Sequence, residues 1–472
     1  MTSKPSKYSQ AAATQDKAFR INMDDRFYGS FAEIGAGQET ANWFFRSTGA
    51  AGTVAKTISA YDMTVSDTLY GPVSRYVSEE RLHQMLDYEY RQLVDRLGAK
   101  RGKDTCFFAY ANTCKCKAYR DSGDWTAWIG VRFQLKPGAE PSDFVMHVRL
   151  TVPDHDVQMR MLGILGVNLL HALFYSRENM DQFVQGISDN LDRAFYEIDF
   201  MRFSGNGFAM FDNRILALQL VRSGLAESTL LCPDGTVAQP ADMLYKRPIV
   251  LMRGSFMPIC NIHMEMMESV HKKFLDVLPE EQRARVVDIC EISLSNLLRG
   301  EDVDLVAFLD RADALAALGK TVMVTNITHF HRLSTMLKQY TREPVAIALS
   351  IGLLNELFQD KWADIPGGIL ASMGHIVVNN TKFYVTPWVN RETGEFVTAG
   401  SYHPPRKYRH LYRHLQDDGD IIEVPYFNQK LLFKTPRDIV QMICEGNEEW
   451  KEYVPEAAHR MAEHLKETAE DA

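Results

Sequence analysis

The segment GKTVMVTNITHFHRLSTMLKQYTREPVAIAL, residues 319–349, decides the fold class of this chain. It places two short apolar or β-branched runs, 321–325 and 345–349, on either side of an amphipathic stretch at 329–340. Runs without polar alternation indicate strands that are buried on both faces, and the amphipathic stretch indicates a helix that covers one face. The segment therefore predicts a strand–helix–strand unit with parallel strands.

The same alternation continues on both sides of this segment. Outside it, the patterns predict helices at about 213–223, 241–246, 305–318 and 353–362, and strands at 195–203, 228–232, 248–252 and 382–386. The intervening stretch 264–299 has a mostly helical pattern. We therefore predict a Rossmann-like α/β domain over residues 194–460 with a parallel sheet, and a helical insert at 262–300.

The N-terminal half predicts a different arrangement, an α+β domain over residues 21–193. Two runs with mostly alternating apolar and polar residues, 129–135 and 144–150, predict an antiparallel pair, and 78–97 predicts an amphipathic helix. The apolar run 161–174 is shorter than the roughly 20 residues that a membrane span needs, which favours a buried core helix. We expect no membrane segment.

Composition narrows the class of protein. The chain has 472 residues, 46% hydrophobic and 24% charged, and a formal net charge of −9, which argues against a broad nucleic-acid-binding surface. Residues 1–20 are polar and lack the apolar core of a secretory signal, and the seven cysteines are an odd number. We expect a cytoplasmic protein with reduced thiols, a disordered terminus at 1–20 and a frayed one at 461–472.

A family resemblance rests on four segments. They are FAEIGAGQE at 31–39, GAAGTVAKTISAYDM at 49–63, ADMLYKRPI at 241–249 and FLDRAD at 308–313. Together they resemble a widespread family of bacterial proteins of similar length, whose members often carry the names nicotinate-nucleotide adenylyltransferase or TonB-dependent receptor. The resemblance implies a bacterial source and, from the first name, a nucleotide-binding transferase. The His-x-Gly-His element of such transferases is not recognisable, so the resemblance assigns no catalytic residue.

Two N-terminal loops contain candidate ligand-binding residues. In the loop that begins at Gly35, Thr40 stands where a dinucleotide-binding loop has its third glycine, so the loop is either a turn capping the next helix or a specialised ligand loop. Its candidate polar groups are Glu33, Gln38 and Glu39. The second loop, 49–57, lacks the Walker glycine before its Lys-Thr pair, so Lys56 and Thr57 are candidates for a non-Walker phosphate contact, the alternative being small residues that permit close packing.

The best-placed candidates follow the two predicted strands of the opening segment. Asn326 and Thr328 come after the first strand, and Ser350 and Gly352 come after the second. Ligands of open parallel sheets bind beyond the carboxyl ends of the strands, where helix N-termini offer free N–H groups to anions. These residues predict a site for a small anion or a nucleotide phosphate, the alternative being ordinary helix capping. The histidine spacings do not predict a metal site.

Two functional hypotheses follow. The first is a cytoplasmic enzyme or sensor that binds a phosphorylated, nucleotide-like or carboxylated small molecule, with the reaction, the catalytic residues and any cofactor unassigned. The second is a non-catalytic, self-assembling scaffold or protein-interaction module. It is motivated by the lack of a recognisable catalytic constellation and by the 21 methionines and 50 aromatic residues, most expected in the core and some at interfaces. We expect a homo-oligomer, and neither a membrane nor a nucleic acid as partner.

Overall fold

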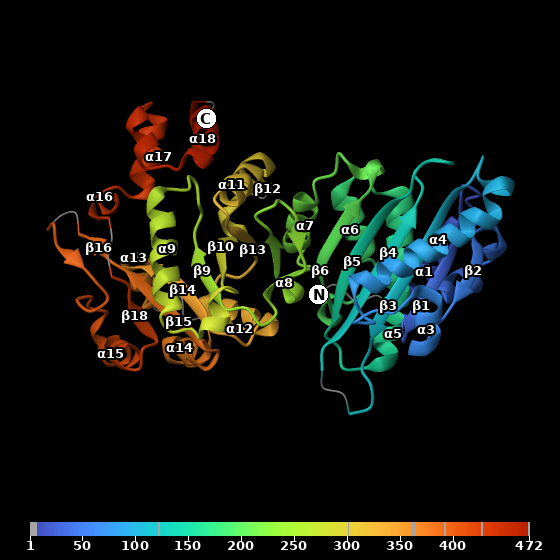
Figure 1. The fold of residues 1–472 in the computed structure, drawn as a ribbon, viewed down its shortest axis with the longest axis horizontal. Coiled ribbons are helices and arrows are strands. Elements are labelled where there is room, and N and C mark those ends of the chain that lie inside the picture. Colours follow the sequence, from blue (N-terminus) through green and yellow to red (C-terminus); the bar gives the residue numbers. More distant parts are fainter. Residues whose placement is uncertain are drawn as a thin grey trace. The chain divides into compact units, whose positions relative to one another are not determined.

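The protein is described from a computed structural model that covers residues 7–120, 123–300, 302–359, 365–390, 393–425 and 428–470. The chain divides into two compact units, the first ending at Glu227 and the second beginning at Ser228 (Figure 1). Each unit has its own sheet and its own hydrophobic core. The α/β class that the sequence predicts is therefore confirmed.

The first unit contains six strands in a single mixed sheet. The strands are β1 (Phe27–Gly35), β2 (Val54–Ile58), β3 (Cys106–Lys115), β4 (Trp125–Phe133), β5 (Ser142–Leu150) and β6 (Tyr196–Ser204). Their order is β2-β1-β3-β4-β5-β6, with β1 parallel to both neighbours and the pairs from β3 to β6 antiparallel. The predicted antiparallel pairing of the strands near 129–135 and 144–150 is confirmed by β4 and β5.

Helices cover both faces of this sheet. They are α1 (Lys7–Asn22), α2 (Thr40–Arg46), α3 (Met63–Tyr70), α4 (Glu79–Arg101), α5 (His155–Tyr175), α6 (Met180–Ile187) and α7 (Asn213–Arg222). The amphipathic α4 lies across one face, where Leu82 and Leu86 approach Gly130 of β4 (Figure 1). On the other face, α5 is the central core helix and packs against α1, α2 and α6.

The helix α5 is the apolar segment that the sequence predicts to be a core helix. It is long and apolar enough to cross a membrane by length and composition, yet 72% of its most apolar window is buried inside the protein. Leu165, Leu169 and Leu173 have no exposed surface. This burial is that of a core helix, as predicted.

The N-terminal residues differ from the prediction of disorder over 1–20. Within the described residues, α1 begins at Lys7, and its Ala18 and Ile21 are fully buried in the core of the first unit. Lys17 donates hydrogen bonds of 2.8 Å to Asn168 of α5 and to Asp189. The polar composition misled the prediction because only a few of the residues of this helix face the core.

The second unit is built on an eight-stranded sheet. Its strands are β7 (Ser228–Leu231), β8 (Val237–Ala238), β9 (Ile249–Arg253), β10 (Val287–Ser293), β13 (Thr321–Thr325), β14 (Val345–Ser350), β15 (Thr381–Thr386) and β18 (Ile421–Glu423). Their order is β18-β15-β14-β9-β10-β13-β7-β8. The six strands from β18 to β13 are parallel, whereas β7 and β8 pair in antiparallel fashion at one end.

Helices connect the parallel strands. The larger ones are α9 (Asn261–Leu275), α11 (Leu305–Ala317), α12 (Phe330–Tyr340), α13 (Ile351–Leu357), α14 (Gly368–Val378), α15 (Arg409–Asp417), α17 (Pro436–Cys444) and α18 (His459–Glu470), with the short α8 (Pro240–Leu244), α10 (Glu280–Arg283) and α16 (Gln429–Leu432) between them. Two small antiparallel pairs, β11 (Leu298–Arg299) with β12 (Asp302–Val303) and β16 (Trp388–Val389) with β17 (Phe396–Val397), complete the unit. The predicted strand–helix–strand segment is confirmed as β13, α12 and β14.

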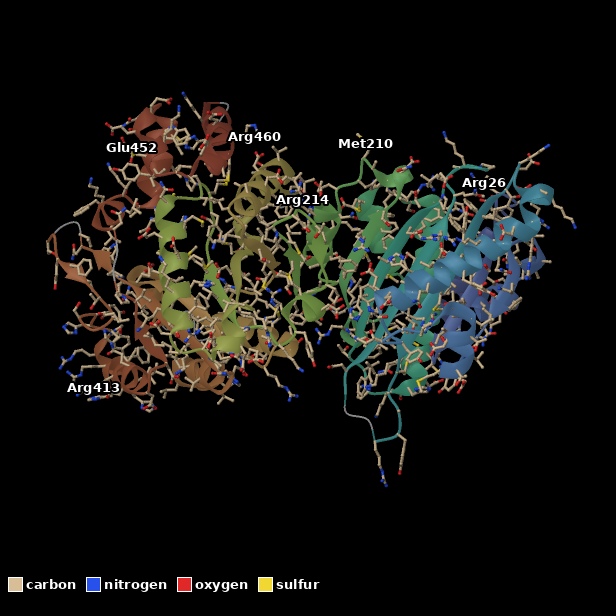
Figure 2. All side chains as sticks on the ribbon, viewed as in Figure 1. Arg26, Met210, Arg214, Arg413, Glu452 and Arg460 are labelled. Carbon is tan, nitrogen blue, oxygen red and sulfur yellow. The ribbon has the colours of Figure 1, made fainter. Side chains whose placement is uncertain are left out.

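Three features of the second unit differ from the predictions. The stretch 262–300, expected to be a helical insert, contains the central strand β10. The second domain, expected from residue 194, begins at Ser228, because β6 pairs with β5 in the first sheet. The terminus expected to fray from 461 forms most of α18, where Met461 and Ala462 are buried, and Arg460 (labelled in Figure 2) and His464 contact Asp310 of α11.

Candidate functional site

The chain adds the parallel strands of the second unit first on one side of β9 and then on the other, so the strand order reverses between β9 and β14. From β9, the chain adds β10 and then β13 on one side, after which it returns to add β14, β15 and β18 on the other side. The six strands thus follow the order of the doubly wound dinucleotide-binding sheet. In sheets of this order, the connections that leave the two central strands run in opposite directions, and ligands bind in the crevice at the carboxyl ends of those strands. Below, the crevice means this position after β9 and β14.

Two short segments border this reversal point. After β14, Ser350 caps α13, with its hydroxyl accepting a hydrogen bond from the N–H of Leu353 at 3.2 Å, and Gly352 in the first turn is exposed. After β9, Gly254 is half-buried and Ser255 is exposed. Helix capping by Ser350 is the alternative that the sequence left open. Ser350 is half-buried and, because it ends β14, it also lies at the crevice.

The start of α9 is covered by the C-terminal part of the chain. The backbone N–H of Asn261 donates to the carbonyl of Tyr453 at 2.7 Å, and its side-chain amide donates to the carbonyl of Glu452 at 3.0 Å. The N–H of Cys260 donates to Nδ1 of His263 at 3.0 Å. These N–H groups are therefore already bonded, and the first turn of α9 is not an open anion site.

A buried ion pair stands beside the reversal point. Arg253 at the end of β9 donates to both carboxylate oxygens of Glu291 on β10, at 2.5 and 3.0 Å, and the side chain of Glu291 has no exposed surface. The hydroxyl of Thr325 at the end of β13 also donates to Glu291. Because each charged atom has a polar partner, this pair links three strands at the carboxyl edge of the sheet.

The ion pair also positions the turn that contains two predicted site residues. The guanidinium of Arg253 donates to the backbone carbonyls of Ile327, at 2.8 Å, and of Thr328. Asn326 and Thr328 are exposed on this turn. The sequence analysis did not single out Arg253 or Glu291. The available signal was the position of Arg253 directly after the predicted strand 248–252, at the carboxyl end of that strand.

The expected grouping of Asn326 and Thr328 with Ser350 and Gly352 needs a correction. The sequence treats their two strands as neighbours, but β9 and β10 lie between β13 and β14. At about 4.8 Å per strand spacing, the two groups are separated by roughly 14 Å. The crossover after β13 causes this separation because it passes over both strands. Ser350 and Gly352 border the crevice, and Asn326 and Thr328 do not.

Three histidines and a serine lie near the turn after β13. The rings of His329 and His331 stack with centroids 5.4 Å apart, His375 of α14 lies 6.4 Å from His331, and Ser372 lies 3.1 Å from Nδ1 of His331. Burial and the neighbouring histidines lower the pKa of His331, which favours a neutral ring. Within the described ranges, no group of three or more His, Cys, Asp or Glu residues is arranged to hold a metal ion.

In the first unit, Glu33 of β1 is a buried residue whose carboxylate contacts the first turn of α2. Its oxygens accept hydrogen bonds from the N–H groups of Thr40, at 3.0 Å, and Ala41, at 3.2 Å, and from the amide of Asn112, at 3.2 Å. Burial raises the pKa of Glu33 to about 7, although the hydrogen bonds oppose the shift. The turn-and-cap alternative for this loop is thus the geometry observed, with an unusual buried cap.

The rest of this loop packs tightly onto the sheet. A Cβ atom added to Gly37 would lie 2.9 Å from Sγ of Cys114, and one added to Gly35 would lie 2.3 Å from the carbonyl oxygen of the same residue. Gln38 bonds back to the carbonyl of Gly35 at 2.9 Å, and Glu39 lies 3.8 Å from Arg46. A nine-residue strand, β1, precedes the loop.

The second predicted loop forms a short 3-10 turn (Ala50–Gly52) and β2 rather than a phosphate cradle. The ammonium group of Lys56 forms an ion pair of 2.5 Å with the fully buried Glu89 of α4, whose carboxylate also accepts from Tyr70 at 3.0 Å. Thr57 is exposed on the edge strand β2. Lys56 is thus engaged by a carboxylate, and the structure does not bring it or Thr57 to the loop of Glu33.

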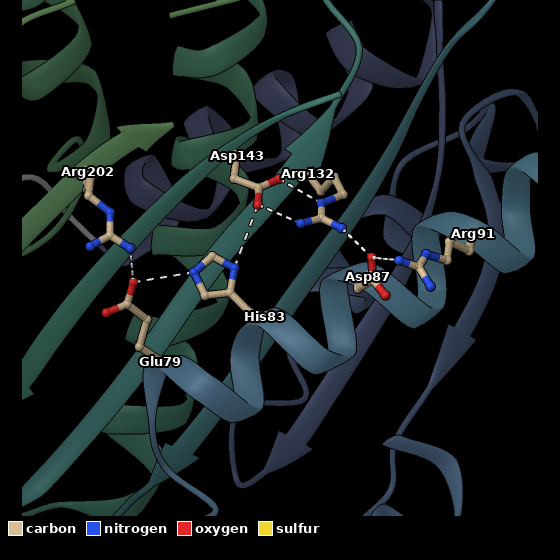
Figure 3. Close-up of polar contacts among 7 residues, drawn as sticks. All are labelled: Glu79, His83, Asp87, Arg91, Arg132, Asp143 and Arg202. Carbon is tan, nitrogen blue, oxygen red and sulfur yellow. Dashed lines mark hydrogen bonds and ion pairs between the residues drawn. The ribbon is translucent and has the colours of Figure 1, made fainter. Parts of the chain in front are cut away.

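A charged network that the sequence analysis missed connects α4 with the first sheet (Figure 3). His83 of α4 lies between Asp143 of β5, at 3.6 Å, and Glu79, at 3.3 Å. Arg132 of β4 bonds Asp143 through two nitrogens at 2.8 Å each. The two carboxylates raise the pKa of His83 to about 9, first through Asp143 and then through Glu79. Because acidic and basic side chains alternate along this network, each contact is attractive, and the network holds α4 on the sheet.

Comparisons with known proteins found no matching family model and no matching curated protein. Among solved structures, the competence/damage inducible protein CihA from Agrobacterium tumefaciens is 17% identical, with a TM-score of 0.25, and the match covers 37% of this chain and 99% of that one. A CinA superfamily protein from Klebsiella pneumoniae is 12% identical, with a TM-score of 0.26 and coverages of 37% and 98%. One from Escherichia coli is 14% identical, with a TM-score of 0.26 and coverages of 36% and 95%. These proteins belong to a different family from the one that the sequence resembles, and similarities at this level assign neither a family nor a function.

Proposed function

We propose that the second unit binds a phosphorylated, nucleotide-like or carboxylated small molecule at the carboxyl ends of β9 and β14. The observation that carries this proposal is the reversal of strand order between these two strands. In open parallel sheets, ligands bind in the crevice that such a reversal creates, because helices leave it on opposite faces. Ser350 and Gly352 after β14, with Ser255 after β9, supply hydroxyl and backbone N–H groups there.

The residues of the turn after β9 restrict the class of ligand. A dinucleotide-binding turn has three glycines that let the backbone approach a pyrophosphate, whereas here only Gly254 follows β9 before Ser255 and the buried Phe256. Glu291, which occupies the strand where an acidic residue would bond a ribose hydroxyl, already accepts from Arg253 and Thr325. We therefore favour a ligand with one phosphate or carboxylate over a dinucleotide, and we assign no reaction.

A pair of variants at one glycine tests the proposed position. An added Cβ at Gly352 meets nothing closer than 3.7 Å, so Gly352→Asp fits and an acidic residue is tolerated in the first turn of a helix. In a thermal-shift screen of nucleotides, NAD precursors and sugar phosphates, we expect at least one compound to stabilise the wild type. That stabilisation should survive Gly352→Ala and disappear in Gly352→Asp, because the new carboxylate repels an anion.

Two outcomes would contradict the proposal. One is a hit that survives Gly352→Asp but disappears in Asn326→Ala, which would move the site to the edge of β13. The other is an absence of any stabilising compound together with a large oligomer in light scattering, which would favour the scaffold hypothesis. The homo-oligomer itself stays a prediction that the same light-scattering measurement tests.

A further inference from the structure

A cavity of about 460 Å³ lies at the opposite edge of the second sheet from the crevice between β9 and β14. Asp288, the second residue of β10, and Lys320, immediately before β13, line it at the amino ends of these two parallel strands. Residues of α9, among them Met264 and His271, form another wall. No residue of this cavity belongs to the crevice described above.

The centre of the cavity is a carboxylate held by two basic groups. Oδ1 of Asp288 lies 2.6 Å from Nδ1 of His271, and its Oδ2 accepts from Nζ of Lys320 at 2.7 Å. Burial alone would raise the pKa of Asp288, but the bonds from His271 and Lys320 outweigh it and hold that pKa below its ordinary value. The carboxylate therefore stays ionised and keeps both basic side chains in fixed positions.

Each basic group retains hydrogen-bonding capacity beyond its bond to Asp288. His271 uses Nδ1 on Asp288, so Nε2 is the ring nitrogen on the side away from it, and Lys320 has three N–H donors of which Asp288 takes one. Met264 and Leu318 add apolar surface to the lining. At the rim, Lys272 pairs with Glu268 at 2.7 Å, and both side chains are more than 60% exposed.

We propose that this cavity binds a small molecule with one anionic group, a phosphate or a carboxylate, attached to an apolar body. Lys320 donates to the anionic group, as does Nε2 of His271 in its imidazolium form, while Met264 and Leu318 contact the apolar part. Counted with His271 as the imidazolium, the lining has three cationic side chains, His271, Lys272 and Lys320, against the carboxylates of Asp288 and Glu268, so one positive charge remains to attract an anion. A cationic ligand is disfavoured because both carboxylates of the lining, Asp288 and Glu268, are already paired with basic side chains.

The test uses phenyl phosphate and benzoate as probes of the full-length protein in calorimetric titrations. The wild type should bind at least one probe saturably. Lys320→Met and His271→Gln should each weaken binding at least tenfold, and Lys272→Met by a few-fold. Lys273→Met is the matched control, because Lys273 is the neighbouring lysine of α9 and pairs with Asp276 at 3.4 Å outside the cavity lining; it should bind as the wild type does.

The outcomes separate this cavity from the crevice. Binding that is lost in Gly352→Asp but unchanged in Lys320→Met and His271→Gln would place the probe at the crevice and overturn the proposal. Saturation by neither probe at millimolar concentration would overturn it as well. Because Lys320→Met removes a partner of a buried carboxylate, circular dichroism must confirm its fold, and Lys272→Met at the exposed rim provides a second variant whose folding is not at stake.

Discussion

A single buried carboxylate, that of Glu33 in β1, makes the stability of the first unit depend on pH. Glu33 has a pKa of about 7 in the folded protein, against an ordinary value of 4.5. The folded state thus holds its proton more tightly than the unfolded state does, so stability falls as the pH rises from about 4.5 to 7. Glu33→Gln removes this titration. The advantage of the wild type over Glu33→Gln in urea unfolding should therefore shrink by roughly 2–3 kcal/mol between pH 5 and pH 8; a constant difference would contradict the prediction.

His83 produces a dependence of the same direction at higher pH. Its folded pKa of about 9 exceeds the ordinary 6.5, so its stabilising effect is complete below about pH 6.5 and is lost as the pH rises through 9. The side chain is one-third exposed, so we expect His83→Gln to cost only about 1–2 kcal/mol at pH 6. Denaturant titrations at pH 6, 8 and 10 should show this cost decline toward zero. A cost that persists at pH 10 would assign His83 a packing role instead.

At the scale of elements, α5 and α2 approach each other closely at one glycine. A Cβ atom on Gly166 would lie 2.4 Å from Oγ1 of Thr40 and 2.6 Å from the hydroxyl of Tyr110. Gly166→Ala should therefore cost about 1–3 kcal/mol, because a buried helix must shift. In the neighbouring α6, a Cβ on Gly186 would meet only Ala172 at 3.7 Å, so Gly186→Ala should be neutral or stabilising by about 0.4–1 kcal/mol. Thermal denaturation of both variants measures the contrast, and equal losses would contradict it.

Elements with a local pattern could be predicted, and those that depend on distant partners could not. The strands β13 and β14 and the helix between them follow from apolar runs and helical periodicity over a few residues. The strand β10 was missed because its pattern Val-Asp-Ile-Cys-Glu-Ile-Ser includes two acidic residues and follows a helix. Glu291 is tolerated there because Arg253, 38 residues earlier in the chain, neutralises it. Strand order is likewise non-local, which explains the wrong grouping of Asn326 with Ser350.

At the scale of the whole molecule, truncated polypeptides test the boundary between the two units at residue 227. A polypeptide that ends at Glu227 retains β6 and α7, whose Phe203 and Leu216 belong to the core of the first unit. One that ends at residue 193, the boundary expected from sequence, exposes the edge of β5 and loses those core residues. We expect the longer piece to show a cooperative unfolding transition and the shorter one to aggregate. Equal behaviour in calorimetry would contradict the observed boundary.

The position of α5 in the chain also has a consequence for synthesis. Its 21 residues are apolar enough that, alone, they would resemble a membrane-spanning segment to the machinery that recognises nascent chains. By the time residue 175 leaves the ribosome, however, β1 to β5, α1 and α2 have already been translated. Only α6, β6 and α7 remain to be added to the first unit. The order of the elements lets the nascent chain shelter this long apolar helix as it emerges.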